Sequence, residues 1–85
     1  MDATVVDEVR KVVRDHGRLT VDLDTLGDDA DLFQAGMSSH ASVSVMLALE
    51  ESLDIEFPDR MLTRHVFGSI AAITAALSEV RAEAA

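Results

Sequence analysis

Apolar residues recur at helical spacing in the first part of the chain. Valines stand at positions 5, 6, 9, 12 and 13, and charged residues fill most of the positions between them. An apolar stripe with a period of about 3.6 residues is typical of an amphipathic helix. The pattern therefore predicts a helix over residues 3–16, with Gly17 as the residue that ends it.

The pattern changes over residues 18–38. Apolar residues alternate there with polar ones, at Leu19, Val21, Leu23 and Leu26. This spacing would suit a strand, but the sequence offers no second strand for it to pair with. We therefore expect a long loop that its leucines hold against the core. Within this loop, residues 31–33 are expected to form a short helical turn with Phe33 as a core anchor.

The clearest helical pattern begins near Ser38 or Ser39 and runs to about Leu53. Helical angles separate its residues into two faces. The face expected to meet the core holds Ser42, Val45, Met46, Leu49 and Leu53. The face expected to meet solvent holds His40, Ser44, Leu47 and Glu51. Leu47 is thus an apolar residue on the wet face, and since single exposed leucines are ordinary, the pattern alone leaves its role open.

The remaining residues predict one short and one long helix. Residues 55–58 should be extended, because a residue that precedes proline avoids the helical region. Asp59 to about Thr63 can form a short third helix. Ser69 is a good N-cap for a last helix, with apolar residues at 70, 73 and 77 and an end near residues 80–83. We expect one all-α domain over residues 1–85, frayed over about 82–85.

Composition narrows the possible functions. The 85 residues include no cysteine and carry a net charge of −9, with 16 acidic and 7 basic residues. This charge repels phosphate backbones, so nucleic acid is not an expected partner. The longest apolar run, residues 45–49, is far too short to span a membrane, and the first residues lack the pattern of a signal peptide. We therefore expect a cytoplasmic protein without a membrane partner.

Three apparent chemical motifs fail on closer inspection. A calcium loop that starts at Asp22 would need an oxygen ligand at Leu26 and a glutamate at Phe33. A nucleophile elbow that starts at Gly36 would need glycine where His40 stands. The three histidines show no metal-ligand spacing. We predict no metal site, no catalytic residue and no enzymatic activity.

Acidic residues are concentrated in one half of the chain. Residues 20–59 contain ten Asp or Glu and no Lys or Arg. Such a segment can be an ordinary solvated face. It can also be a docking surface for basic partners, and the absence of basic residues over this length favours docking.

Three segments at fixed distances resemble the acyl carrier protein family. They are D-L-F-Q-A-G-M-S-S-H at 31–40, M-L-A-L-E-E at 46–51 and I-E-F-P-D at 55–59. The family pattern reads D-L-x-x-x-G-x-D-S-L, then an acidic amphipathic helix, then I-x-I-P or I-x-F-P. Ser69, Ile70 and Ile73 resemble the start of the last family helix, so the similarity covers residues 5–77.

The resemblance implies a small four-helix bundle with a long first loop and a short third helix. It also implies a carrier without chemistry of its own. The family's serine matches Ser39, and a phosphopantetheinyl transferase esterifies it with 4′-phosphopantetheine from coenzyme A. The thiol of this arm holds the cargo as a thioester, which suits a chain without cysteine. The phosphodiester suits the start of a helix, where backbone N–H groups are free.

The resemblance also assigns a partner face, and the sequence departs from the family pattern at three positions. The partner-facing positions of the family match His40, Ser44, Leu47 and Glu51, and Leu47 matches a residue that docks into partner grooves. Further candidates to pair with partner arginines are Glu50, Glu56 and Asp59. Ser38 and His40 replace the aspartate and leucine that flank the family's serine, and Ser44 stands where an acidic residue is usual. The sequence therefore leaves open which transferase acts, and whether Ser39 or Ser38 is modified.

The G-M-S-S-H version of the motif is most similar to stand-alone aminoacyl carrier proteins. In that subgroup, a ligase resembling class II seryl-tRNA synthetase activates a small amino acid such as glycine or alanine and passes it to the arm. We therefore predict a monomeric aminoacyl carrier. Two alternatives remain: an acyl carrier for fatty-acid or polyketide synthesis, and an unmodified acidic helical adaptor. The enzyme that accepts the cargo is not evident from the sequence.

Overall fold

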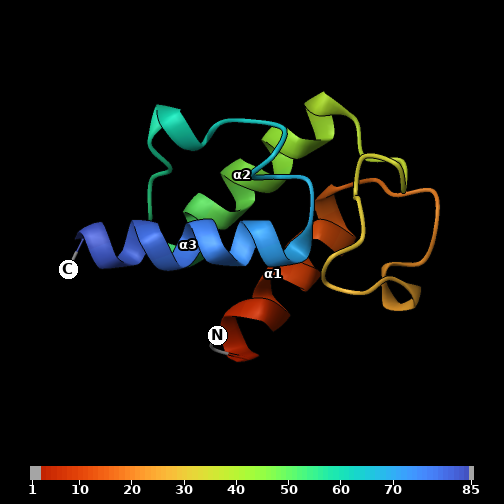
Figure 1. Cartoon of the computed structure of the whole chain (residues 1–85), viewed down its shortest axis with the longest axis horizontal. Coiled ribbons are helices and arrows are strands. Elements are labelled where there is room, and N and C mark those ends of the chain that lie inside the picture. The colour runs from red at the N-terminus through yellow and green to blue at the C-terminus, as the bar shows by residue number, and fades with distance from the viewer. Residues whose placement is uncertain (1–2, 85) are drawn as a thin grey trace.

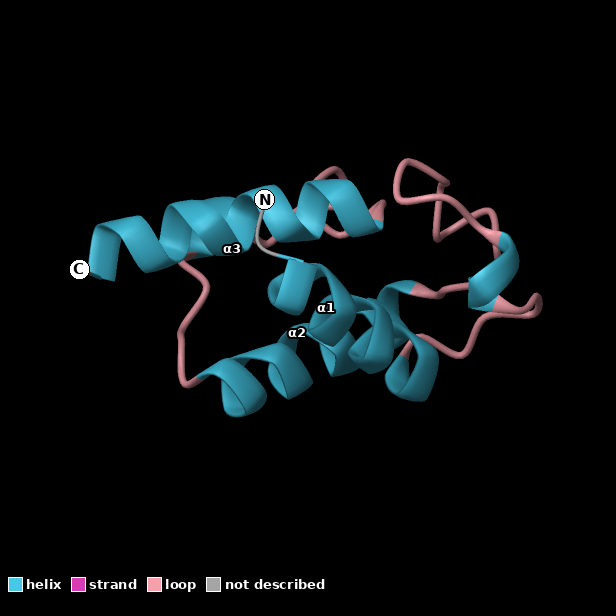
Figure 2. Cartoon of the chain, turned by 90° about the horizontal axis from the view of Figure 1, so that it is seen from below, coloured by secondary structure: helices cyan, strands magenta, loops and turns pink. Residues whose placement is uncertain are grey.

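Three α-helices surround the core in the computed structural model, which describes residues 3–84 (Figure 1). The elements are α1 (Ala3–His16), the 3₁₀ helix η1 (Leu23–Thr25), α2 (Ser39–Leu53), the 3₁₀ helix η2 (Asp59–Met61) and α3 (Ile70–Ala84). α1 packs against both α2 and α3. Figure 2 shows helices and loops alone over the described residues, which confirms the all-α prediction. No described helix is both long enough and apolar enough to cross a membrane.

α1 buries the valine stripe that the sequence predicts. Four of its five valines are buried and Val6 is half-buried against the core. The helix ends at His16, and the Gly17 N–H donates to the Val13 carbonyl oxygen at 2.8 Å. After the end of α1, the residue with left-handed backbone conformation is Arg18, with φ of 55°. Gly17 therefore follows the helix without a positive φ of its own.

The connection between α1 and α2 is held by its leucines, as predicted. It wraps around one end of the molecule, on the right in Figure 1. Leu23, at the start of η1, is buried, and Leu19 and Leu26 are half-buried against the core. Val21 differs from its neighbours, because 48% of its surface remains exposed.

Phe33 packs against the core, as the sequence predicts, but it is only half-buried. The turn itself is present, since the Ala35 N–H donates to the Asp31 carbonyl oxygen at 3.1 Å. Leu32 is the completely buried residue of this turn, and its N–H donates to the Gly68 carbonyl oxygen at 2.8 Å. Adjacent residues of a turn point in different directions, so Phe33 remains half-buried at the surface.

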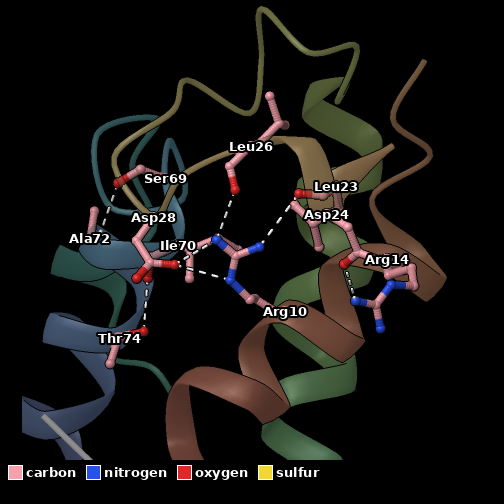
Figure 3. Close-up of polar contacts among 10 residues, drawn as sticks. All are labelled: Arg10, Arg14, Leu23, Asp24, Leu26, Asp28, Ser69, Ile70, Ala72 and Thr74. Atoms are coloured by element: carbon pink, nitrogen blue, oxygen red, sulfur yellow. Dashed lines mark hydrogen bonds and ion pairs between the residues drawn. The ribbon is translucent and has the colours of Figure 1, made fainter. Parts of the chain in front are cut away.

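Arginines of α1 bind the acidic part of the connection (Figure 3). Arg10 donates from Nε and Nη2 to Asp28 Oδ1, at 3.0 and 2.7 Å. Its Nη2 also donates to the Leu26 carbonyl oxygen at 2.9 Å. Arg14 Nη2 donates to Asp24 Oδ1 at 2.7 Å. Asp24 and Asp28 thus hold the connection against α1.

The predicted short third helix is only a single 3₁₀ turn. η2 comprises Asp59–Met61, and Leu62 leaves helical geometry with ψ of 63°. Its N-cap is Pro58, which offers no side-chain hydrogen bond. Burial of Met61 fixes the turn to the core. The predicted count of four helices is therefore not confirmed: the described chain has three α-helices and two 3₁₀ turns.

α3 begins where the sequence predicts. Ser69 Oγ accepts a hydrogen bond from the Ala72 N–H at 3.0 Å, as an N-cap should. Three apolar residues that follow, Ile70, Ile73 and Leu77, are completely buried. The helix continues to Ala84, beyond the point where the sequence predicts fraying, and residue 85 lies outside the described residues.

Candidate functional site

The two serines at the start of α2 have different roles. Ser38 is the N-cap: its Oγ accepts a hydrogen bond from the Ala41 N–H at 3.0 Å, and its carbonyl oxygen accepts one from the Ser42 N–H at 2.9 Å. Ser39 is the first helical residue and is exposed. Within the described chain, the Ser39 hydroxyl has no hydrogen-bond partner. The structure thus leaves Ser39, and not Ser38, with a free hydroxyl.

The backbone before these serines requires a glycine. Gly36 has φ of +113°, a conformation that L side chains rarely adopt. A Cβ there would lie 2.8 Å from the backbone nitrogen of Thr20, which itself donates to the Ala35 carbonyl oxygen at 2.9 Å. This close approach of two loop segments sets the direction in which the chain enters α2.

Ser39 opens onto a groove of about 280 Å³ between α2 and the segment that leads to α3. Its lining is mostly apolar: Phe33, Ser39, Ser42, Val43, Met46, Leu62, Thr63, Arg64 and Phe67. Sequence reasoning missed Val43, Leu62 and Arg64 as site residues. Val43 follows Ser39 by one helical turn, which was the available signal. Leu62 and Arg64 reach the groove only through the tertiary fold.

Fewer residues of α2 are buried in the core than the sequence predicted. Val45 and Leu49 are completely buried, and Ala41, which the sequence analysis did not single out, is nearly so. The other three predicted core residues are half-buried: Ser42, Met46 and Leu53. Ser42 and Met46 instead form part of the groove wall beside Ser39.

The predicted solvent face of α2 is largely exposed. His40, Leu47 and Glu51 are exposed, while Ser44 is half-buried. Leu47 is 55% exposed, and Val43, one turn earlier, is 48% exposed. The face thus presents two neighbouring apolar side chains, each about half exposed.

Glu50 differs from the other acidic candidates. Its Oε2 accepts a hydrogen bond from the Phe57 N–H at 2.8 Å. Phe57 is buried against Phe67, with ring centroids 5.3 Å apart and an edge-on arrangement. Glu56 and Asp59, by contrast, are exposed. Glu50 therefore positions the segment after α2, a contact that sequence spacing did not indicate.

The acidic charge is less continuous in space than in sequence. Arg10 and Arg14 reach the acidic connection from α1 and form ion pairs with Asp28 and Asp24. Within the described residues, no ion pair involves Glu51, Asp54, Glu56 or Asp59. Asp22, Asp29 and Asp31 of the connection also form no ion pair in the described chain, so unpaired acidic charge lies both on the connection and around the second half of α2.

A profile of a known protein family matches most of this fold. The family is described as "Phosphopantetheine attachment site", and the match covers residues 7–77. The chain belongs to the phosphopantetheine-binding carrier proteins. Members of this family carry their cargo on a phosphopantetheine arm. The carrier role and the prosthetic group predicted from the sequence are thereby confirmed.

Individual relatives identify the branch of the family. The chain is 49% identical over 73 residues to an aminoacyl carrier protein of Agrobacterium fabrum, covering 86% of this chain and 83% of the relative. This carrier is thus a homologue of an aminoacyl carrier protein, which confirms the subgroup suggested by the motif.

Solved structures show the same relationship. Two are complexes of an engineered Bradyrhizobium japonicum glycine:[carrier protein] ligase with a carrier protein from Agrobacterium tumefaciens. In the complex with AMP, the similarity has a TM-score of 0.82 at 45% identity and covers 86% of this chain and 97% of the matched one. In the complex with ATP, the TM-score is 0.86 at 43% identity, and the similarity covers 89% of this chain and 99% of the matched one. A solution structure of a protein from Agrobacterium tumefaciens matches with a TM-score of 0.74 at 44% identity. The similarity covers 94% of this chain and 99% of the matched one.

The surroundings of Ser39 fit an attached phosphopantetheine. Its hydroxyl is free to be esterified, and the backbone N–H groups of Ser39 and His40 have no hydrogen-bond partner in the described chain. These groups, at the positive end of the helix dipole, can receive a phosphodiester. The groove beside Ser39 offers an apolar wall for the rest of the arm.

Proposed function

We propose that this carrier protein holds an activated small amino acid, such as glycine or alanine, as a thioester on an arm attached to Ser39. The observation that carries the assignment of Ser39 is the division between two adjacent serines. Ser38 Oγ is engaged as the helix cap, at 3.0 Å from the Ala41 nitrogen, whereas the Ser39 hydroxyl is exposed and unbonded in the described structure. A nucleophilic hydroxyl has to be accessible to its transferase.

Attachment is a simple displacement at phosphorus. Ser39 Oγ attacks the β-phosphorus of coenzyme A, and the bond to the leaving 3′,5′-bisphosphate nucleotide breaks while the serine proton passes to a base of the transferase. Once bound, the arm supplies the thiol that a chain without cysteine lacks. The protein presents this thiol, and its partner enzymes perform the activation and transfer of the amino acid.

A small cargo agrees with the shape of the site. The core contains completely buried side chains, including Leu32, Leu49 and Ile70, and none of these three lines the groove that contains Ser39. The groove is open to solvent along α2 and provides an apolar wall rather than an interior chamber. A long acyl chain would gain from an enclosed apolar cavity, whereas an amino acid needs none. This contrast favours an amino acid over the acyl cargo of the alternative hypothesis.

The exposed face of α2 is proposed as the surface that docks onto the partner enzymes, a phosphopantetheinyl transferase and an adenylating amino acid:carrier protein ligase. Leu47 and Val43 supply its apolar centre, His40, Ser44 and Glu51 flank them, and Glu56 and Asp59 add acidic charge at one end. An apolar anchor within a charged rim is a recurrent mode of helix recognition. Glu50 is assigned a structural role instead, because its carboxylate already accepts the Phe57 N–H. Since coenzyme A and such ligases operate in the cytoplasm, the proposal places the carrier there, as a monomer.

The test is intact-protein mass spectrometry after incubation with coenzyme A and a broad-specificity transferase, followed by fragmentation. We expect a gain of one phosphopantetheine on Ser39, which Ser39→Ala abolishes and Ser38→Ala retains. The modified protein is then incubated with ATP, a glycine:[carrier protein] ligase and a panel of amino acids. Thioester formation with glycine or alanine supports the proposal. An adduct on Ser38 contradicts the assignment of Ser39, and failure of every transferase supports the unmodified adaptor.

A further inference from the structure

Arg64 stands beside the site without a role in the proposed function. It lines the groove that contains Ser39, and among the described residues that line this groove it is the only charged one. Its guanidinium carbon lies 4.1 Å from the centroid of the Phe33 ring. No ion pair or hydrogen bond occupies the Arg64 guanidinium in the described chain.

The stacked ring gives this guanidinium a defined position. Phe33 is itself held by Asp31, whose Oδ1 accepts the Phe33 N–H at 2.9 Å. A guanidinium stacked on an aromatic face gains cation–π attraction and loses part of its freedom to rotate. Its N–H donors remain available at the edge of the plane, in the fork geometry that suits two phosphate oxygens.

The charge pattern of the chain gives a reason for a cation at this place. Residues 20–59 carry ten acidic residues and no basic one, and Ser39 lies near the middle of this segment. A phosphodiester on Ser39 adds a further negative charge to an already acidic protein. An arginine that lines the same groove reduces this repulsion, and does so best where the surrounding wall is apolar.

We infer that Arg64, stacked on Phe33, binds the phosphodiester of the arm and thereby directs the arm along the groove wall of Val43 and Leu62. This inference rests on the proposed attachment to Ser39. Before attachment, the same arginine borders a second hollow that also contains Asp29 and Asp31. Neither carboxylate forms an ion pair with the guanidinium in the described chain, so the guanidinium is available to the phosphodiester, and modification of Ser39 should change the surroundings of Arg64.

The test compares the protein before and after modification by NMR. Mass spectrometry first verifies one phosphopantetheine on Ser39 in each sample. In the wild type, we expect the Arg64 Nε–Hε resonance to shift on modification. In modified Arg64→Gln, the ³¹P resonance should move most of the way toward that of a free phosphopantetheinyl-serine peptide, and the two methyl signals of the arm should lose their separation. Arg81→Gln is the matched control, because Arg81 is exposed near the far end of α3.

Each outcome of this comparison is decisive. Arg64→Lys keeps the charge but not the planar fork, so its ³¹P resonance should lie between those of the wild type and Arg64→Gln. An Arg64 resonance that stays unchanged on modification, or a ³¹P resonance that is the same in Arg64→Gln and Arg81→Gln, overturns the inference while the carrier function stands. Absence of the adduct from Ser39 overturns both.

Discussion

The guanidinium of Arg10 binds a single carboxylate oxygen of Asp28 through two of its nitrogens, across 18 positions of the chain (Figure 3). The same guanidinium donates to the backbone carbonyl of Leu26. The Asp28 carbonyl oxygen in turn accepts the Ala71 N–H at the start of α3, at 2.9 Å. Arg10 therefore links α1, the long connection and α3, and this connection leads directly to Ser39.

Loss of the Arg10 contacts should loosen the connection. We expect Arg10→Met to lower the free energy of unfolding by about 1–3 kcal/mol, since it leaves a carboxylate and a carbonyl without their charged donor. The neighbouring Lys11→Met is the matched control, because Lys11 is exposed and takes part in no ion pair of the described chain. Chemical denaturation of both variants measures the difference. Equal stabilities of the two variants would show that the Arg10 contacts contribute nothing to the free energy of unfolding.

Substitution of the two serines should affect two different properties. Ser38→Ala should lower stability, and Ser39→Ala should abolish modification. Ser38→Ala removes the N-cap and should lower the free energy of unfolding by about 1 kcal/mol, or the Tm by about 4–8 °C. Ser39→Ala should change stability little, because its hydroxyl makes no hydrogen bond within the described structure. Thermal denaturation and intact mass are measured on both. The reverse assignment would follow if Ser39→Ala proved the less stable and Ser38→Ala stayed unmodified.

Gly36 should tolerate no side chain. Gly36→Ala forces a Cβ to within 2.8 Å of the Thr20 backbone nitrogen at φ of +113°, so we expect a loss of about 1–3 kcal/mol. Gly27→Ala serves as the control, because a Cβ there meets nothing within 4 Å. Urea titrations of the two variants give the comparison. A Gly36→Ala variant as stable as Gly27→Ala would show that the loop shifts without strain.

Glu50 and Glu51 should differ although they are adjacent. Glu50→Ala leaves the buried Phe57 N–H without its acceptor and should cost about 1–3 kcal/mol. Glu51→Ala should keep its stability and weaken charging by the ligase, since Glu51 is exposed on the proposed docking face. Denaturation and the ligase kinetics of both modified variants test this division. Slower charging at unchanged stability in Glu50→Ala would return Glu50 to the docking face.

Leu47 should matter for docking and not for folding. Leu47→Ala removes a side chain that is 55% exposed, so we expect a Tm near that of the wild type and a raised KM of the ligase for the modified carrier. Val21→Ala provides the control, because Val21 is 48% exposed but lies on the long connection and not on α2. A large drop in Tm for Leu47→Ala would show that Leu47 belongs to the core. An unchanged KM would remove it from the docking face.

Periodic patterns predicted the long elements well because each reports on local geometry. The valine stripe of α1, the end of α2 at Leu53 and the cap of α3 at Ser69 lie where the sequence places them. Prediction was weaker in the short segments. Phe33 and Leu32 are adjacent apolar residues in one turn, and only packing against Gly68 decides which of them is buried. The third helix shrinks to Asp59–Met61, because Pro58 and Leu62 confine it to one turn.

The helical framework, the acidic character and the motif of the carrier family could be predicted before the fold was known, because they depend on residue type and spacing along one chain. The tertiary structure was needed to show which serine hydroxyl is free, which N–H the Glu50 carboxylate accepts, and that Arg64 and Ser39 line the same groove. The physical reason is that a hydrogen bond or a groove depends on atoms from distant segments meeting in space. Their meeting is fixed by the packing of the whole core, and no local pattern records it.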